Sequence, residues 1–225
     1  WLVVFRYIPI WGWLISLFNY KFNISFLNQQ WVGLKYFIEL VNDQRFWQDF
    51  RNTLGMSVLG LASGFIFPIT FALSLNEVRR MAFKRSIQTV SYLPHFLSWV
   101  VVTGIFMKIL STDGGAVNDL LVVLGILKEP VQFMAQPKLF WWLITIVNVW
   151  KEMGWSSIIY LAAIAGIDQE LYQAAMVDGC NRFQKIMHIT LPGISSTIVI
   201  LFIMDFGHLT QIGFEKQMLM GNSIV

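Results

Sequence analysis

Charged residues are scarce in this chain. Asp, Glu, Lys and Arg make up 13% of its 225 residues, whereas soluble domains carry roughly 25%. Hydrophobic residues make up 56% of the chain, and its mean hydropathy is +0.60. This composition excludes an ordinary soluble domain and indicates a protein that is embedded in a membrane.

Several other features are missing. The single cysteine, Cys180, excludes an internal disulfide. No Gly-x-x-x-x-Gly-Lys-Ser/Thr segment is present, so the chain lacks a phosphate-cradling loop and cannot hydrolyse ATP by itself. The three histidines and one cysteine show no metal-ligand spacing, so no metal site is expected. The chain begins with Trp1 instead of Met, so we expect an N-terminal piece to be missing.

Long apolar runs mark the membrane spans, since a helix needs roughly 20 apolar residues to cross a bilayer. The third run is interrupted by Lys151 and Glu152, and the fourth by Asp205 and His208. Residues 1–18 look like a first span that is cut short, so we count five spans. The four complete ones are predicted over 52–76, 86–110, 139–166 and 193–212.

The connections between these runs predict the orientation. Residues 76–86 carry four basic residues against one acidic residue, and 111–138 carry two basic against three acidic. The positive-inside rule then places 76–86 in the cytoplasm. Alternation of the spans places 19–51 and 111–138 outside and returns 167–192 to the cytoplasm. Because topology explains the basic cluster, nucleic-acid binding is not supported.

The external connection 111–138 is too long for a simple turn. Asp113-Gly114-Gly115 is a turn signal. A short interfacial helix is then predicted by the helical spacing of Val117, Leu120, Leu121 and Leu124. Such a helix could meet an extracytoplasmic partner, or it could form a lid on its own spans.

The cytoplasmic connection 167–192 predicts a helix, a turn and a second helix. Asp168 can cap the first helix, and Glu170 lies in its first turn, where the helix dipole favours an anion. Gly179 is a left-handed stop. One face of this helix is expected to hold Leu171, Ala174, Ala175 and Asp178.

The second helix of this connection has its own start and stop signals. Asn181 can cap it, with Gln184 as the capping-box partner. Pro192 is expected to end this helix and to open the next one.

Residues Gln173-Ala174-Ala175, Gly179 and Ile189-x-Leu191-Pro192 resemble the EAA motif of binding-protein-dependent ABC importer permeases. The family pattern has Glu-Ala-Ala, then Gly, then Ile-x-Leu-Pro at these spacings. Gln173 departs from the pattern, which removes a carboxylate but leaves the helix geometry intact. The alternative interpretation is an ordinary amphipathic cytoplasmic loop.

Three further stretches, 92–96, 150–155 and 158–163, resemble the LplB-like branch of carbohydrate permeases, close to those that import polysaccharide fragments. The resemblance implies an all-α integral membrane fold, the transmembrane domain of a type I ABC importer. Members of this family have six spans, so we expect a sixth span beyond the loop at 211–225.

The resemblance also implies the partners and the place of action. A transport subunit of this kind works in the bacterial plasma membrane with a second permease, identical or homologous. Two separate ATPase subunits bind ATP and Mg. An extracytoplasmic solute-binding protein delivers an oligosaccharide, and membrane lipid surrounds the permease. Coupling to the ATPase is expected at Leu171, Gln173, Ala174, Ala175, Asp178 and Gly179.

Ionisable groups inside a membrane are costly and are candidates for function. Adjacent residues point about 100° apart on a helix, so we expect Lys151 and Glu152 to find partners on other helices or in a wet cavity, and not in each other. The alternative is an interhelical salt bridge that only fixes packing. The predicted substrate path comprises His95, Trp99, Lys151, Glu152, Trp155 and Asp205.

Aromatic and small residues add weaker indications. Trp99, Trp150 and Trp155 could line a sugar cavity or could pack, whereas Trp141 and Trp142 suit an interfacial belt. In the second span, Gly60-x-x-x-Gly64 permits close helix approach, and Pro68 is expected to kink the helix.

A second hypothesis is an intramembrane lipid- or glycan-processing enzyme. Its acid-base set would be Lys151, Glu152, His95 and Asp205. It requires two of these groups to converge within hydrogen-bond reach of one site.

Overall fold

The computed structural model describes residues 1–209 and 214–221. Contacts divide the chain into two compact units, Trp1–Thr53 and Leu54–Val225. The predicted all-α class is confirmed, because 77% of the chain is helical and the described sheet is a two-stranded hairpin.

The first unit is a short helical segment followed by the hairpin. Its elements are η1 (Val3–Tyr7), η2 (Ile8–Leu17), β1 (Phe18–Asn19), η3 (Phe26–Asn28), β2 (Gln30–Trp31) and α1 (Lys35–Asn42). Strand β1 pairs antiparallel with β2. The buried Gln29 amide closes the connection, since its Oε1 accepts from the Lys21 N–H at 2.9 Å and its Nε2 donates to the Lys21 carbonyl at 2.8 Å.

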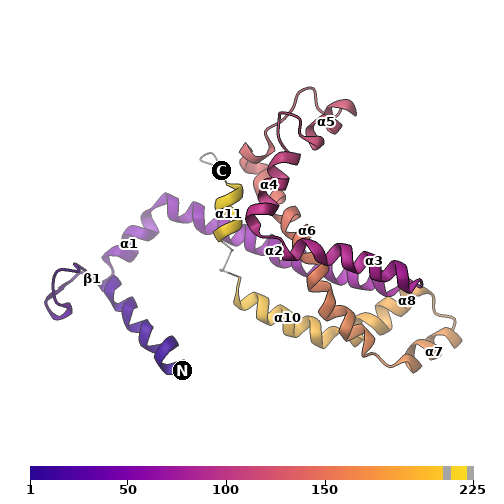
Figure 1. The fold of residues 1–225 in the computed structure, drawn as a ribbon. Helices are drawn as coiled ribbons and strands as arrows, with labels where there is room; N and C mark the ends of the chain where they lie inside the picture. Colours follow the sequence, from indigo (N-terminus) through magenta and orange to yellow (C-terminus); the bar gives the residue numbers. More distant parts are fainter. Residues whose placement is uncertain (210–213, 222–225) are drawn as a thin grey trace. The chain divides into compact units, whose positions relative to one another are not determined.

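The regular elements in the described part of the second unit are all helices. Figure 1 shows α7 and α8 at the end of this unit opposite to α5. Its elements are α2 (Gln44–Asn76, which begins in the first unit), α3 (Met81–Tyr92), η4 (Leu93–Phe96), α4 (Trp99–Ile109), α5 (Ala116–Val123), η5 (Phe133–Ala135), α6 (Pro137–Ala165), α7 (Gln169–Val177), α8 (Arg182–Lys185), η6 (Ile186–Thr190), α9 (Leu191–Gly193), α10 (Ser195–Gly207) and α11 (Phe214–Met220).

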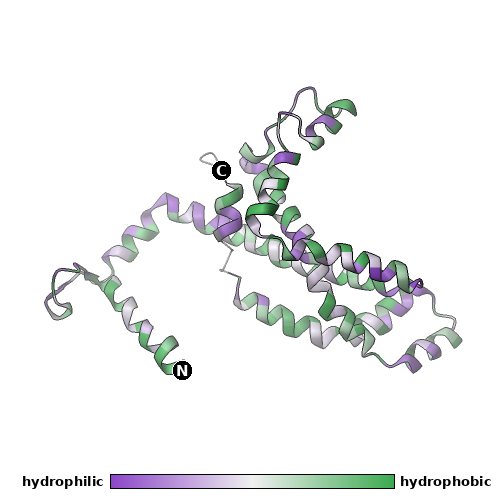
Figure 2. Ribbon diagram, viewed as in Figure 1, coloured by the Kyte–Doolittle hydropathy of each residue, from purple (hydrophilic) through white to green (hydrophobic). Residues whose placement is uncertain are grey.

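Among the described helices, α2 is long and apolar enough by itself to cross a membrane, and up to three spans result if each bent helix pair counts as one. Helix α2 runs unbroken from Gln44 to Asn76 and contains Pro68 in its interior. Helix α6 has the length of a span but does not reach the same apolarity, because Lys151 and Glu152 lie in its middle. Figure 2 shows apolar residues along α10 and hydrophilic ones at α8 and at the start of α2.

The segment expected as one span over 86–110 is bent. Helices Met81–Phe96 and Trp99–Ile109 meet at 105°. Pro94 occupies the short helix before the bend, and Ser98 then caps α4 by accepting the Val101 N–H at 3.3 Å. A proline followed by a helix cap therefore restarts the helix in a new direction.

The segment expected over 193–212 is also bent, by 59° between Gly193 and Ser195; its residues 210–212 lie outside the described residues. Pro192 lies in the first turn of α9, as expected of a proline that opens a helix, but the helix from Arg182 continues through it to Gly193, so the expectation that it ends the preceding helix was wrong. Ahead of it the helix widens into the π-turn Ile186–Thr190, in which the Leu191 N–H bonds to the Ile186 carbonyl. This wider turn accommodates the proline ring and delays the bend.

Two apolar cores hold the second unit together. The first contains Ala72, Tyr160, Ile164, Ile167 and Ile194 and joins α2, α6 and the start of α10. The second contains Val102, Phe140, Ile144, Val147 and Met220 and joins α4, α6 and α11. The polar stretch of α6 around Lys151 and Glu152 lies between these two cores along the helix.

Close helix approach occurs at a different glycine from the expected pair. A Cβ placed on Gly60 or Gly64 would meet no atom within 4 Å. A Cβ on Gly154, in contrast, would overlap the carbonyl of Ser91. Gly154 is therefore where α3 crosses α6, and the Gly60 face stays open in this chain.

Candidate functional site

The first helix of the 167–192 loop is built by local capping, as predicted. Asp168 Oδ1 accepts the Glu170 N–H at 2.9 Å at the start of α7. At its end Gly179 adopts φ +76°, and the Cys180 N–H returns to the Ala175 carbonyl at 2.9 Å. These bonds satisfy groups that a helix leaves free at its ends.

The capping box predicted for the second helix is confirmed. Gln184 N–H donates to Asn181 Oδ1 at 2.9 Å, and Asn181 N–H donates to Gln184 Oε1 at 2.8 Å. The turn between α7 and α8 is therefore fixed on both sides by contacts between near neighbours in the sequence.

The inner face of α7 differs from the expected one. Tyr172 packs against the first core, and its hydroxyl lies 3.0 Å from Thr190 Oγ1. Ala175, one helical turn later, is 8% exposed. The face expected from Leu171, Ala174, Ala175 and Asp178 is thus split, because the bulky Tyr172 sets the rotation of the helix and only Ala175 of the four is buried.

The outer face of α7 and the turn after it are exposed, including Gln173, Ala174, Asp178 and Gly179. Sequence reasoning missed a further exposed apolar group, which consists of Met176 and Val177 on α7 and Phe183 on α8. Their signal was available, since large exposed apolar residues in a polar connection between apolar segments indicate a contact surface.

An ion pair connects this loop to the other connection predicted to be cytoplasmic. Arg182 Nε lies 4.0 Å from Glu77 Oε2, and both side chains are largely exposed. Such a pair contributes little stability. It does place the 76–86 and 167–192 connections beside each other, as the charge-based topology expects.

The predicted polar residues of α6 meet η4 in one cluster. Glu152 Oε2 lies 2.7 Å from His95 Nδ1, and Glu152 Oε1 lies 3.1 Å from Lys151 Nζ. Lys151 Nζ also donates to the His95 carbonyl at 2.7 Å. As expected, Lys151 and Glu152 both find a partner on another element, His95 of η4. The expectation that they do not pair with each other was wrong, because their long side chains both bend toward His95.

Burial differs between the two charges of this cluster. Lys151 is 5% exposed, and its Nζ lies 5.5 Å from the centroid of the Trp99 ring. A buried ammonium requires a counter-charge and hydrogen-bond acceptors, which Glu152 and the His95 carbonyl supply. The Glu152 side chain is 31% exposed, so the pair is not closed off from its surroundings.

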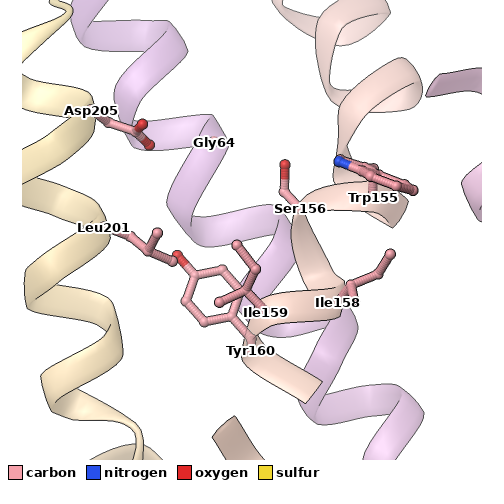
Figure 3. Close-up of a pocket in the computed structure, with 8 residues that line it drawn as sticks. All are labelled: Gly64, Trp155, Ser156, Ile158, Ile159, Tyr160, Leu201 and Asp205. Carbon is pink, nitrogen blue, oxygen red and sulfur yellow. The ribbon is translucent and has the colours of Figure 1, made fainter. Parts of the chain in front are cut away.

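Trp155 connects the cluster to a cavity of about 370 Å³ between α2, α6 and α10. Its ring stacks on His95 with centroids 4.5 Å apart and planes 1° from parallel. Figure 3 shows Trp155 and Tyr160 on α6, with Asp205 across the cavity on α10. The Asp205 carboxylate bonds to no described side chain, so the structure does not bring it into the His95 cluster.

The other tryptophans divide by environment. Trp150 is partly exposed and meets Phe106 edge-on at 5.4 Å, so it packs outside the cavity. Trp142 is exposed, as a membrane-interface residue would be, whereas Trp141 packs against the second core. His208 makes a local contact, with Nδ1 2.8 Å from the Met204 carbonyl.

The predicted external helix is present as α5, and a residue that sequence reasoning missed holds its loop. Asn118 is fully buried, donates to the carbonyls of Ser111 at 2.8 Å and Val131 at 3.1 Å, and accepts the Val131 N–H at 2.8 Å. Leu120 and Leu124 remain exposed. These two side chains therefore do not pack on the described helices as a lid would.

Comparisons with known proteins agree with this arrangement. Residues 58–214 match the family described as binding-protein-dependent transport system inner membrane component. The chain is 42% identical to the polygalacturonan/rhamnogalacturonan transport system permease protein YteP of Bacillus subtilis (strain 168), over 98% of this chain and 68% of that protein. It is 40% identical to protein LplB of the same organism, over 99% of this chain and 69% of that protein.

Solved structures show the same fold. A bacterial ABC transporter involved in the import of the acidic polysaccharide alginate contains a chain that matches all of this one and 74% of its own length, with 38% identity and a TM-score of 0.87. A second structure, that transporter with an alginate pentasaccharide-bound periplasmic protein, matches all of this chain and 73% of its own, with 38% identity and a TM-score of 0.86.

Proposed function

The chain belongs to the family of inner membrane components of binding-protein-dependent transport systems, and we propose that it moves oligosaccharides released from polysaccharides into the cell. It is a permease component of an ABC importer and has no ATPase site of its own. It works as a multi-pass protein of the bacterial plasma membrane, beside a second permease and two ATPases that bind ATP and Mg.

One observation carries the proposal: α7 is a capped helix with an exposed apolar outer face and an anchored inner face. Its inner face is tied to the body of the unit through Tyr172 and Thr190. Its outer face exposes Ala174 and Val177. A short helix that is rigidly joined to the core transmits a push from an ATPase better than a mobile loop does.

The oligosaccharide path runs along the His95, Glu152 and Trp155 cluster and the neighbouring cavity. Sugar hydroxyls require hydrogen-bond partners, and the apolar faces of sugar rings suit aromatic rings. The partly exposed Glu152 carboxylate offers the former, and the Trp155 ring at the cavity offers the latter. The predicted path residues Trp99, Lys151 and Asp205 complete the polar lining or support it.

The transport cycle follows from differential affinity. A solute-binding protein delivers the oligosaccharide to the external face near 111–138. ATP stabilises the closed pair of ATPases over the open pair, and each ATPase moves the coupling helix that it holds. The paired permeases then change from inward-facing to outward-facing, and hydrolysis resets them.

The enzyme hypothesis has a geometric basis, because His95 and Glu152 lie within hydrogen-bond reach. Membership of the family assigns transport instead. In a permease, the same contact fixes the orientation of His95 and therefore of the Trp155 ring stacked on it.

The test replaces one exposed valine in each loop. Val177→Arg on α7 should weaken ATPase co-purification and ATPase stimulation by substrate, because a long charged side chain obstructs the outer face. Val123→Arg on α5 is the matched control for co-purification, since Val123 is 83% exposed and Val177 is 88% exposed. Equal co-purification of the ATPase with both variants would contradict the docking role of α7.

A further inference from the structure

A second cavity of about 220 Å³ lies beside the one already described and contains an unusual cation. Asn148 of α6, Asp205 of α10 and Lys216 of α11 all line it, together with Gly60 of α2. Because Gly60 has open space around it, this cavity is not filled by packing between helices. Its polar groups therefore have room for a ligand.

Lys216 lacks a counter-ion within the described residues. Its Nζ donates to Asn148 Oδ1 at 3.1 Å and lies 5.8 Å from the centroid of the Trp99 ring. No described carboxylate comes within 4.0 Å of it. Lys151, by contrast, has Glu152 at 3.1 Å. Lys216 is hydrogen-bonded to a neutral amide and interacts with the Glu152 carboxylate only beyond ion-pair distance. A half-buried ammonium of this kind favours an anion that arrives from outside.

We infer that Lys216 and Asn148 bind the carboxylate of a uronic acid unit, so the transported substrates are acidic oligosaccharides. This inference rests on the proposed function. Asn148 Oδ1 is occupied by Lys216, which turns the amide so that its Nδ2 remains a free donor. An ammonium and an amide N–H together match the two oxygens of a carboxylate.

Asp205 sets the direction in which such a sugar unit lies. Its carboxylate lines the same cavity and makes no ion pair with a described residue. It repels a uronate carboxylate and accepts hydrogen bonds from sugar hydroxyls. The nearby Glu152 is already held by Lys151 and His95. The sugar carboxylate therefore points to Lys216 and the hydroxyls point to Asp205.

The experiment measures uptake into proteoliposomes that hold the full transporter, with its binding protein and ATP. The two probes are trigalacturonate and the same trisaccharide with its carboxyl groups reduced to alcohols. The readout is the ratio of acidic to neutral uptake, relative to the wild type, so the selectivity of the binding protein cancels. Lys216→Gln should lower this ratio about tenfold, which corresponds to one lost charged hydrogen bond.

Two further variants separate recognition from packing. Lys216→Arg should keep the preference for the acidic sugar, because the charge remains. Asn148→Asp should remove it without touching Lys216, because the new carboxylate pairs with that ammonium. Lys35→Gln, at an exposed lysine of α1, should leave the ratio unchanged.

Each outcome decides a separate question. An unchanged ratio in Lys216→Gln, or an equal loss of both probes in that variant, would overturn the carboxylate site and leave a packing role. Import of neither probe by the wild type would overturn the proposed function itself. A lowered ratio in Lys216→Gln and Asn148→Asp, with Lys216→Arg preserved, would support the site.

Discussion

The α7–α8 loop and the cluster around Lys151 both depend on polar contacts, but the contacts have different ranges. In the loop, each side-chain capping bond joins residues two or three positions apart. In the cluster, His95 is joined to Lys151 and Glu152 across 56 and 57 positions. The loop is therefore specified locally, whereas the cluster exists only once α6 has packed against η4.

This difference matters for a transporter. A locally fixed helix keeps its shape while an ATPase pushes on it. A cluster made by two distant segments can change when those segments move. The cluster ties the bend between α3 and α4 to α6, so we expect motion of α6 to be transmitted to that bend.

The largest expected effect comes from removing one charge of the cluster. Glu152→Ala leaves the buried Lys151 without a counter-charge, with the His95 carbonyl and the Trp99 ring as its remaining partners. It should cost about 3 kcal/mol of stability, seen as a lower Tm of the purified complex. Glu39→Ala is the control, because the Lys35–Glu39 pair is exposed at 3.9 Å and is worth about 0.5 kcal/mol or less. Equal losses in the two variants would contradict a buried role for the cluster.

Replacing both charges sharpens the same point. Lys151→Met combined with Glu152→Leu should be less destabilising than Glu152→Ala alone, since no buried charge is left without a partner. This coupling is measured by comparing the Tm values of the wild type, Lys151→Met, Glu152→Leu and the double variant. Additive losses would show that Lys151 and Glu152 act independently.

The next effect concerns the crossing of α3 and α6. Gly154→Val should destabilise the complex by about 1–3 kcal/mol, because its side chain would overlap the Ser91 carbonyl. Gly60→Val has open space within this chain and should leave the fold intact. Thermal unfolding checks both variants, and a greater loss at Gly60 would contradict the crossing point.

Local strain in the loop should have a smaller effect. Gly179→Val forces a branched side chain into φ +76°, which costs about 1–2 kcal/mol. It should reduce ATPase stimulation, because α7 would end in a different direction. Gly207→Val in open space is the control, and equal stimulation in the two variants would exclude a directing role for Gly179.

The ranges of these contacts explain what the sequence could predict. Asp168, Gly179 and the Asn181–Gln184 box were predictable because each acts on its own neighbours. The burial of Ala175 was not, because it depends on how Tyr172 packs against a distant core. The contact between Lys151 and Glu152 required His95 to be brought close by the fold.

The bends show an intermediate case. Pro94 and Ser98 were visible in the sequence as a helix breaker and a cap, yet long apolar runs favoured a single straight span. Pro192 gave the opposite error. A helix end was expected there, but the helix continues because the preceding π-turn accommodates the proline ring. Apolarity locates a membrane segment, but the backbone bonds around each proline decide its path.

The smallest expected effect is at the anchor of α7. Tyr172→Phe removes the hydroxyl that lies 3.0 Å from Thr190 Oγ1 and should cost about 1 kcal/mol. Amide hydrogen exchange within α7 should become faster, while α6 exchanges as before. Unchanged exchange in α7 would show that the apolar ring alone holds the helix.

Uptake into proteoliposomes tests the central claim most directly. The complete complex, with ATP inside and the solute-binding protein outside, should accumulate a labelled oligosaccharide against its gradient. Accumulation should stop when ATP or the binding protein is omitted. Two results would contradict an importer driven through α7. One is accumulation that continues without ATP. The other is a Val177→Arg variant whose uptake is preserved but no longer depends on ATP.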